Sequence, residues 1–308
     1  MKSVALSRRL ILGGLAASAV LARSAAVRAQ TASAPRIVAL GGAATEILYA
    51  LGLGDQVVGV DVSSGFPPEA RKKPNVGYYR AISAEGALAL SPTLIIATDG
   101  AGPKEAMDVL AAASVKLVSL KEIKAAEDIP ARILTVAEAA GAPERGAELA
   151  AAVSADLKSL SDDVAQIGKR RRTLLLLGPP RSGTLMAGGA GSSGAFALTL
   201  AGADNAAAAL SGWKPLTDEA AYGIAPDAIV VLQTGSPVSP QEIAQRPALA
   251  DSPAVKEGRV ITADALGLVG FGPRAAHAAF DVAKKIYPEA TFRDLPPRAW
   301  TGKSAAGR

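Results

Sequence analysis

Short apolar segments that alternate with helical patterns constrain the fold of this chain more than any other feature. The apolar segments lie at residues 36–40, 56–62, 94–97, 116–120, 173–177, 229–232 and 259–262. Helical signals lie between them, at residues 45–51, 83–90, 103–113, 194–201 and 273–286. Strands that alternate with helices form mostly parallel sheets with helices on both faces. The fold class predicted from this order is α/β.

A short unit that occurs in both halves of the chain indicates two similar lobes. In the first half, Ser83 and Glu85 are followed by a proline seven residues after the glutamate and then by an apolar run. In the second half, Thr217 and Glu219 are followed in the same way. A hydroxyl residue before an acidic first turn is typical of a helix N-terminus, and the proline predicts the turn into a buried strand.

Between the two halves, residues 143–168 have the pattern of one long helix. Its apolar residues recur at helical spacing: Leu149, Val153, Leu157, Leu160, Val164 and Ile167. Pro143 stands in the first turn, where a helix tolerates proline. We therefore predict two Rossmann-like α/β lobes, residues 30–142 and 169–290, joined by one long rigid helix and followed by an irregular tail at residues 291–308.

Residues 1–29 have the composition of an export signal. They contain five cations and no acidic residue, and their apolar stretch at residues 10–22 is too short to span a bilayer as a helix. Small side chains predict cleavage after about Ala29. The pair Arg8-Arg9 favours the twin-arginine route over the general secretory route. We therefore expect the mature chain in the periplasm.

Charge and composition argue against several classes of function. The formal net charge of +5 is accounted for by the five cations of residues 1–29, so the rest of the chain is near neutral and no nucleic-acid partner is expected. The chain has no cysteine, and His277 is its one histidine, which excludes thiolate or multi-histidine metal centres. No nucleophile motif accompanies that histidine, so a Ser-His-Asp triad is not predicted. We expect His277 to pack or to lie at the surface. We predict a binding protein and not an enzyme.

Glycine-rich and basic segments of the second half give weaker signals. Residues 178–183 have the spacing of a phosphate-binding loop, but Thr184 and Leu185 replace the Lys and Ser/Thr that such a loop needs, so nucleotide binding is not predicted. Residues 188–194 either simply require small side chains or allow a flat ligand to approach the backbone. The basic residues 169–172 complement the dipole of the preceding helix or form a phosphate-binding patch.

The segment "NVGYYRAISAEG", residues 75–86, contains the strongest candidate for binding chemistry. A phenolate is a hard anionic ligand that suits ferric iron, and tyrosine is a known axial ligand of haem. A guanidinium close to a phenol favours the phenolate and lowers its pKa. Tyr78, Tyr79 and Arg80 therefore form either an iron-binding cluster or an ordinary loop in which one tyrosine packs and the other is exposed.

Three segments carry a resemblance to a known family: "RIVALGGAATEILYALGLGDQVVGVD", "PNVGYYRAISAEGALALSPTLIIAT" and "GLVGFGPRAA". They resemble the periplasmic haem-binding proteins of bacterial haem ABC importers, within the wider class of vitamin B12 and ferric-siderophore binding proteins. The likeness covers residues 36–287. It implies that haem binds in the cleft between two lobes and passes to an inner-membrane ABC permease with its ATPase. It also implies a monomeric carrier for iron uptake, with an outer-membrane haem receptor system upstream.

The resemblance assigns roles to individual residues. Tyr78, directly after a glycine, matches the family's axial ligand to haem iron, and Arg80 matches the arginine that stabilises its phenolate. Tyr79 occupies the variable position between them, so we expect Tyr79→Phe to leave iron ligation nearly intact. Glu85 and Glu219 match the family's paired lobe-surface glutamates, which meet arginines of the permease.

Two further residues are weaker candidates for contact with haem. Arg274, in "GFGPR", is expected to meet a haem propionate because of its charge, and Met186 is a candidate sixth ligand to iron. The loops of the second lobe near Met186 contain no histidine, so a histidine-completed site and a two-haem site are not expected. Corrinoid or ferric-siderophore binding is the alternative within the class, and an exported hydrolase is a third interpretation.

Overall fold

The computed structural model describes residues 34–178, 184–234 and 238–302. The predicted export signal, residues 1–29, lies outside the described residues, and so does most of the segment with phosphate-loop spacing. Within the described ranges, every helix is too short or too polar to cross a membrane.

The first lobe is built on a four-stranded parallel sheet with the strand order β2-β1-β5-β6. Its strands are β1 (Ile37–Leu40), β2 (Val57–Val60), β5 (Leu94–Ala97) and β6 (Lys116–Ser119). Its helices are α2 (Gly42–Ala50), α3 (Ala84–Ala89), α4 (Lys104–Ala112) and α5 (Asp128–Ala139), with the short turns η1 (Gly54–Gln56) and η2 (Pro68–Lys72). A separate hairpin joins β3 (Gly77–Tyr78) and β4 (Ala81–Ile82).

The two faces of this sheet explain why its central strands are continuous apolar runs. In β1, Ile37 and Ala39 pack with α2 and α5, whereas Val38 and Leu40 pack with α3 and α4. Successive side chains of a strand point to opposite faces, so a strand that is covered on both faces is apolar throughout. The predicted α/β fold with a parallel sheet is therefore confirmed for this lobe.

The second lobe contains a mixed six-stranded sheet with the order β10-β8-β7-β11-β12, and β9 also pairs with β7. Its strands are β7 (Arg172–Leu177), β8 (Met186–Gly188), β9 (Asp204–Asn205), β10 (Trp213–Pro215), β11 (Ala228–Gln233) and β12 (Val260–Asp264). The strands β7, β11 and β12 are parallel, whereas β8 pairs antiparallel with both β7 and β10. Its helices are α7 (Ser193–Leu200), α8 (Asp218–Ile224), α9 (Pro240–Ala244), α10 (Pro247–Ala250), α11 (Pro253–Lys256), α12 (Ala265–Val269) and α13 (Ala275–Ile286).

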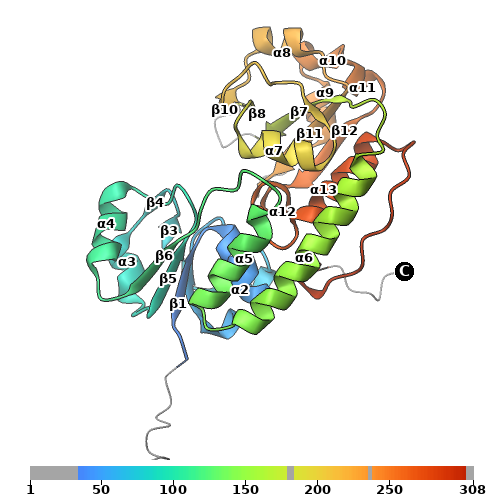
Figure 1. Cartoon of the computed structure of the whole chain (residues 1–308). Helices are drawn as coiled ribbons and strands as arrows, with labels where there is room; N and C mark the ends of the chain where they lie inside the picture. Colours follow the sequence, from blue (N-terminus) through green and yellow to red (C-terminus); the bar gives the residue numbers. More distant parts are fainter. Residues whose placement is uncertain (1–33, 179–183, 235–237, 303–308) are drawn as a thin grey trace, which may run out of the picture. The chain divides into compact units, whose positions relative to one another are not determined.

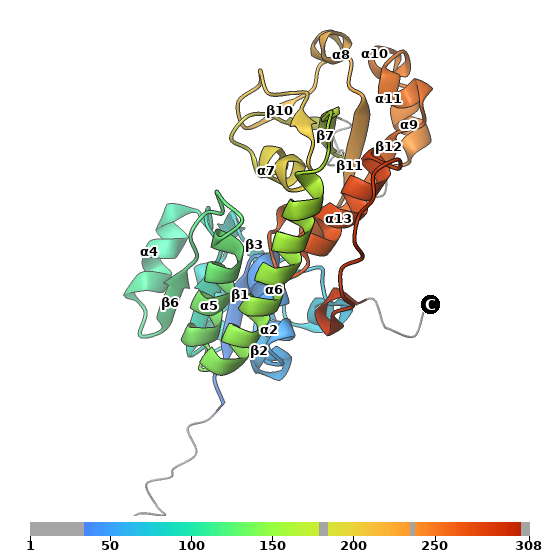
Figure 2. The ribbon, with the colours of Figure 1, turned by 45° about the vertical axis from the view of Figure 1, so that its right-hand side comes forward.

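A single long helix, α6 (Pro143–Val164), joins the lobes. It begins at the predicted proline and ends four residues before residue 168. It packs against α5 of the first lobe and against α13 and α7 of the second, as Figures 1 and 2 show. One cluster of buried side chains runs from Ile37 of β1 through Val153 of α6 to Val230 of β11. Because that core is continuous, the helix is bound to both lobes along its length.

The repeated unit of the sequence forms the same structure in both lobes. Ser83 accepts a hydrogen bond from the backbone N–H of Gly86 at 3.0 Å, and Thr217 accepts one from Ala220 at 3.2 Å. Each hydroxyl caps a short helix, α3 or α8, which leads into a buried central strand, β5 or β11. Both predicted N-caps are confirmed.

The described part of the tail follows an irregular path but is fixed to the rest of the protein. Its regular structure is a single short turn, η3 (Ala299–Thr301), within the described residues. Arg298 forms a two-pronged contact with buried Asp156 of α6, with Nη2 2.7 Å from Oδ1 and Nε 3.0 Å from Oδ2. The indole N–H of Trp300 donates to the carbonyl of Pro273 at 3.2 Å. The tail therefore connects the linking helix with the start of α13.

Candidate functional site

Tyr78 lies at the end of β3 and is directed outward by the glycine before it. Gly77 has a φ of +104°, and a Cβ at this position would lie 3.3 Å from the carbonyl oxygen of Ala81. A residue with a side chain would be strained in this conformation, so the hairpin requires glycine here. Tyr78 is 42% exposed.

A buried carboxylate that sequence reasoning missed holds this hairpin in place. Asp61 follows β2 and is 1% exposed. Its Oδ2 accepts hydrogen bonds from the backbone N–H groups of Ser63 at 3.1 Å and Tyr79 at 3.2 Å, and its Oδ1 accepts one from Gly41 at 2.9 Å. Asp61 therefore ties the hairpin to the turn between β1 and α2.

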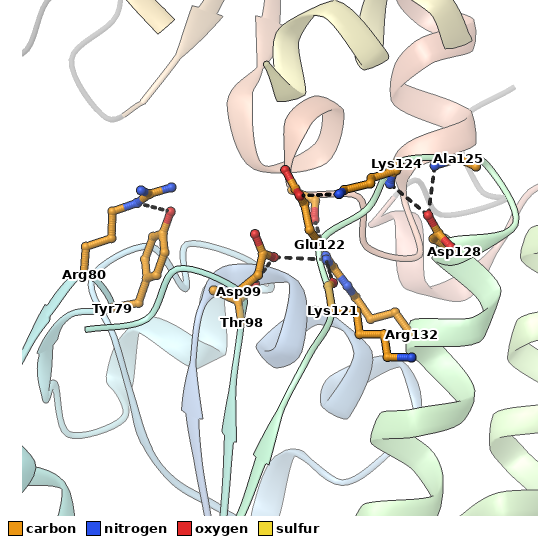
Figure 3. A network of polar contacts seen from close by, with 11 residues as sticks. Tyr79, Arg80, Thr98, Asp99, Lys121, Glu122, Lys124, Ala125, Asp128 and Arg132 are labelled. Atoms are coloured by element: carbon orange, nitrogen blue, oxygen red, sulfur yellow. Dashed lines mark hydrogen bonds and ion pairs between the residues drawn. The ribbon is translucent and has the colours of Figure 1, made fainter. Parts of the chain in front are cut away.

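Arg80 interacts with Tyr79 rather than standing free beside Tyr78. Its Nε donates to the hydroxyl of Tyr79 at 2.8 Å (Figure 3). A Cβ on Gly100 would lie 3.7 Å from each of Cζ, Nη1 and Nη2 of Arg80, so the guanidinium lies flat over this glycine. The rings of Tyr78 and Tyr79 meet edge to face, with centroids 4.8 Å apart. The three side chains lie together, and their contacts also match the ordinary-loop alternative, because Tyr79 packs, Tyr78 is exposed and Arg80 is bonded to Tyr79.

The electrostatics of this cluster keep Tyr78 protonated at neutral pH. Burial raises the pKa of Tyr78 above its ordinary value of 10.0, and the neighbouring phenol of Tyr79 raises it further. Arg80 lowers the pKa of Tyr78, as expected from its charge, but its effect is smaller. A metal that binds the oxygen of Tyr78 must therefore displace a proton.

Next to the hairpin, an arginine connects the carboxyl ends of the strands with the second lobe (Figure 3). Arg132 of α5 is 6% exposed. Its Nη2 donates to the carbonyl of Lys121 at 2.8 Å and contacts the carboxylate of Asp99 at 3.3 Å, while its Nη1 donates to the carbonyl of Gly270 at 3.3 Å. This arginine is a link between the lobes.

Arg274 is already engaged by acidic side chains, which argues against its predicted contact with a propionate. Its side chain is 13% exposed. Its Nε donates to Oε1 of Glu46 at 3.0 Å, its Nη2 contacts the same oxygen, and its Nη1 lies 2.9 Å from Oδ2 of Asp264. The guanidinium also covers the ring of Phe66, with Cζ 3.8 Å from the centroid. Each nitrogen has an acidic partner, and these contacts engage three of the five N–H groups of the guanidinium.

The partner of Arg274 is an unusual carboxyl group. Glu46 of α2 is 3% exposed, and its Oε2 has no hydrogen-bond partner among the described residues. Burial raises the pKa of Glu46 to about 7, although its hydrogen bonds with Arg274 act in the opposite direction. Because Glu46 belongs to the first lobe and Arg274 to the second, this pair also joins the lobes.

The other predicted site residues lie apart from the tyrosine cluster. Met186 begins β8 of the second lobe, is partly buried and pairs with Leu177. Glu85 and Glu219 are exposed in the first turns of α3 and α8. Neither glutamate forms an ion pair within the described ranges.

The glycine-rich loop and the histidine of the second lobe have structural roles. A Cβ on Gly189 would lie 2.3 Å from the carbonyl oxygen of Leu210, and one on Gly194 would lie 3.1 Å from the ring of Trp213. Close packing therefore explains the small residues there. His277 is 9% exposed, and its Nε2 lies 3.1 Å from the carbonyl of Pro296, which agrees with the predicted packing role.

One cavity among the described residues is lined by the second lobe and the tail and not by the tyrosine cluster. A cavity of about 260 Å³ lies along α13 and is lined by Asp264, Arg274 and His277, among others, but not by Tyr78 or Arg80. Its acidic and basic groups include the Arg274–Asp264 pair described above. Among the described residues, no group of three or more His, Asp or Glu side chains could hold a bare metal ion.

Solved structures with the same fold include proteins that are named for haem. The periplasmic haem-binding protein RhuT from Roseiflexus sp. RS-1, in its apo form, is 37% identical, with a TM-score of 0.78; the match covers 84% of this chain and 100% of that chain. The periplasmic haem-binding protein BhuT, in complex with two haems, is 30% identical, with a TM-score of 0.76 over 83% of this chain and 99% of that one.

Two curated relatives point to the wider class. An uncharacterized ABC transporter substrate-binding lipoprotein of Bacillus subtilis, YvrC, is 30% identical over 84% of this chain and 82% of its own length. A vitamin B12-binding protein of Pectobacterium carotovorum is 36% identical, but over 45% of this chain and 46% of its own length. A family model described as periplasmic binding protein matches residues 37–266. The chain therefore belongs to the periplasmic binding protein family.

Proposed function

We propose that this protein captures ferric haem through the phenolate of Tyr78 and delivers it to an ABC permease. The observation that carries this proposal is the exposed phenol of Tyr78, whose ring contacts that of Tyr79, the partner of Arg80, on a hairpin that a buried carboxylate fixes. An iron that arrives in a porphyrin already has four nitrogen ligands, so one protein side chain is enough to hold it. Phenolate oxygen is a ligand that ferric haem accepts.

The haem-binding names of RhuT and BhuT support this ligand over others of the class. A corrinoid is the second candidate, because a relative named for vitamin B12 matches nearly half of the chain. Cobalt in a corrinoid is also held by a macrocycle, so the two ligands differ in the axial chemistry that they demand. A phenolate favours ferric iron.

A titration with both ligands tests the proposal. The mature protein is titrated with hemin, cyanocobalamin and a ferric siderophore, each followed by absorbance and by the quenching of tryptophan fluorescence. We expect saturable binding of hemin with a high-spin ferric–phenolate spectrum, and no saturable binding of the other two. Tighter binding of cyanocobalamin than of hemin would reassign the ligand. The same titration gives the stoichiometry, which we expect to be one haem per chain.

Delivery to the permease would use Glu85 and Glu219. Each is exposed at the N-terminal turn of a short capped helix, one per lobe. Such a pair of anions suits charge-assisted hydrogen bonds with arginines of a partner. In vesicles that contain the permease and its ATPase, Glu85→Lys with Glu219→Lys should abolish haem transport and haem-stimulated ATP hydrolysis. Hemin titration of the free variant checks that it is folded, and normal transport by it would refute the docking role.

A further inference from the structure

Among the described residues, exposed large apolar side chains occur in two kinds of place. Val109, Leu134 and Tyr222 lie on the helices α4, α5 and α8. Val62, which is 60% exposed, and Tyr78 lie instead in the loop after β2 and in the hairpin of β3 and β4. Single apolar residues on a helix surface are ordinary, so the second kind of place is the one that calls for a reason.

A backbone hydrogen bond places Val62 beside Tyr78. The N–H of Val62 donates to the carbonyl of Gly77 at 2.9 Å, and this carbonyl belongs to the peptide group that joins Gly77 to Tyr78. Two residues earlier, Val60 and Asn75 form a parallel bridge, so the two segments run side by side up to this point. Gly77 has no side chain and leaves Val62 uncovered.

The turn that contains Val62 is fixed by the same carboxylate that holds the hairpin. Oδ2 of the buried Asp61 accepts a hydrogen bond from the N–H of Ser63 at 3.1 Å, which closes a tight turn with Val62 at its centre. The same oxygen accepts from the N–H of Tyr79 at 3.2 Å. Valine is β-branched and has few side-chain conformations, so a ligand that covers it removes little freedom.

Val62 also lies where ligands of α/β proteins bind. It follows the carboxyl end of β2 by two residues, and ligands of open α/β sheets bind outside the carboxyl ends of the strands. A porphyrin extends on all sides of its iron, so an exposed apolar group beside the axial ligand meets the ring. Contact removes apolar surface of both the ring and the valine from water.

We propose that Val62 contacts the porphyrin ring itself and supplies affinity for the macrocycle that does not depend on the iron. The proposal rests on the proposed function, because it takes Tyr78 as the axial ligand. The two residues then divide the recognition of haem: Tyr78 binds the metal, and Val62 binds the ring.

Two ligands and two variants test this division. The wild type, Val62→Thr and Tyr78→Phe are each titrated with hemin, followed by absorbance, and with metal-free protoporphyrin IX, followed by its fluorescence. Val62→Thr keeps the shape of the side chain but replaces a methyl group with a hydroxyl. It should weaken the binding of both ligands about three- to tenfold and retain the ferric–phenolate spectrum. Tyr78→Phe should weaken the binding of hemin alone.

A matched control makes the same chemical change elsewhere. Val109 is 52% exposed on α4, and Val109→Thr should leave both affinities unchanged. Because Val62 is exposed, Val62→Thr should unfold at the same urea concentration as the wild type, which checks that it is folded.

Three results would overturn the proposal. The first is binding of both ligands by Val62→Thr within about twofold of the wild type. The second is weaker binding of hemin alone with an altered ferric–phenolate spectrum, which would mean that Val62 acts through Tyr78. The third is a wild type without saturable binding of protoporphyrin IX. If the wild type binds protoporphyrin IX but gives no ferric–phenolate spectrum with hemin, the proposed function fails instead.

Discussion

Two arginines, Arg80 and Arg274, are both expected from the sequence to face the ligand, yet the structure gives them opposite environments. Arg274 is 13% exposed, and its nitrogens are all engaged by Glu46 and Asp264. Arg80 is exposed, uses one nitrogen for Tyr79 and forms no ion pair among the described residues. Arg274, Glu46 and Asp264 form a closed junction between the lobes. Arg80 belongs to an exposed cluster with Tyr79.

The difference lies in how many nitrogens of each arginine other side chains engage. Arg274 and Glu46 lie 228 positions apart in the sequence, so no local pattern announces that this arginine is already paired. A buried ion pair of this kind is costly to break but weak evidence of net stabilisation. This pair joins the two lobes, whereas the hairpin that carries Tyr78 and Arg80 is exposed.

The largest expected effect comes from breaking the closed junction. Arg274→Met should lower the free energy of unfolding by about 3 kcal/mol, the low end for an unpaired buried charge because Glu46 can take up a proton. Arg80→Met should lower it by less than about 1 kcal/mol, because Arg80 is exposed. Urea unfolding at pH 7.5 measures both. Equal losses of unfolding free energy in the two variants would contradict the difference between the closed junction and the exposed cluster.

The second effect is a pH dependence that belongs to the junction. Glu46 keeps its proton up to about pH 7 in the folded protein but only to its ordinary pKa of 4.5 in the unfolded chain. The folded state therefore binds more protons between these values, and stability falls as the pH rises through that window. Between pH 5 and pH 8 the wild type should lose roughly 2–3 kcal/mol more than Glu46→Gln.

Urea unfolding of the two proteins at several pH values checks this prediction. Parallel profiles for the wild type and Glu46→Gln would show that Glu46 is ionised throughout and that the junction is an ordinary ion pair.

A smaller effect extends the comparison to the tail. Asp156 is 2% exposed and receives two hydrogen bonds from Arg298, so Arg298→Gln should cost about 2 kcal/mol. Arg293, whose side chain is 59% exposed, pairs with Asp163, and Arg293→Gln should cost less than about 1 kcal/mol. Thermal unfolding distinguishes the two. An Arg298→Gln variant with the stability of the wild type would mean that the tail does not support the junction.

Much of the fold follows from local patterns in the sequence. The apolar runs at residues 94–97 and 173–177 are strands because both faces of a parallel sheet are covered, and the periodicity after Pro143 gives α6. The antiparallel strands β8 and β10 escaped prediction, since three residues such as Trp213–Pro215 carry no alternating pattern. They are strands because β8 pairs with β7 and β10 pairs with β8, and these pairings join residues that are distant in the sequence.

The site was predictable in its composition but not in its contacts. The cluster of Tyr78, Tyr79 and Arg80 is visible because the residues are adjacent. Asp61 was hidden, because the predicted strand at residues 56–62 includes it, whereas β2 ends at Val60. An acidic residue at the carboxyl end of a parallel strand, with two serines two and three residues later, was the available signal.

One measurement tests the central claim most directly: the absorption spectrum of the hemin complex of the wild type beside that of Tyr78→Phe. We predict a high-spin ferric–phenolate spectrum for the wild type and its loss in Tyr78→Phe, with haem bound at least about tenfold more weakly. Tyr222→Phe serves as the control and should retain the wild-type spectrum. A Tyr78→Phe protein with unchanged spectrum and affinity would contradict the assignment of Tyr78 as the iron ligand.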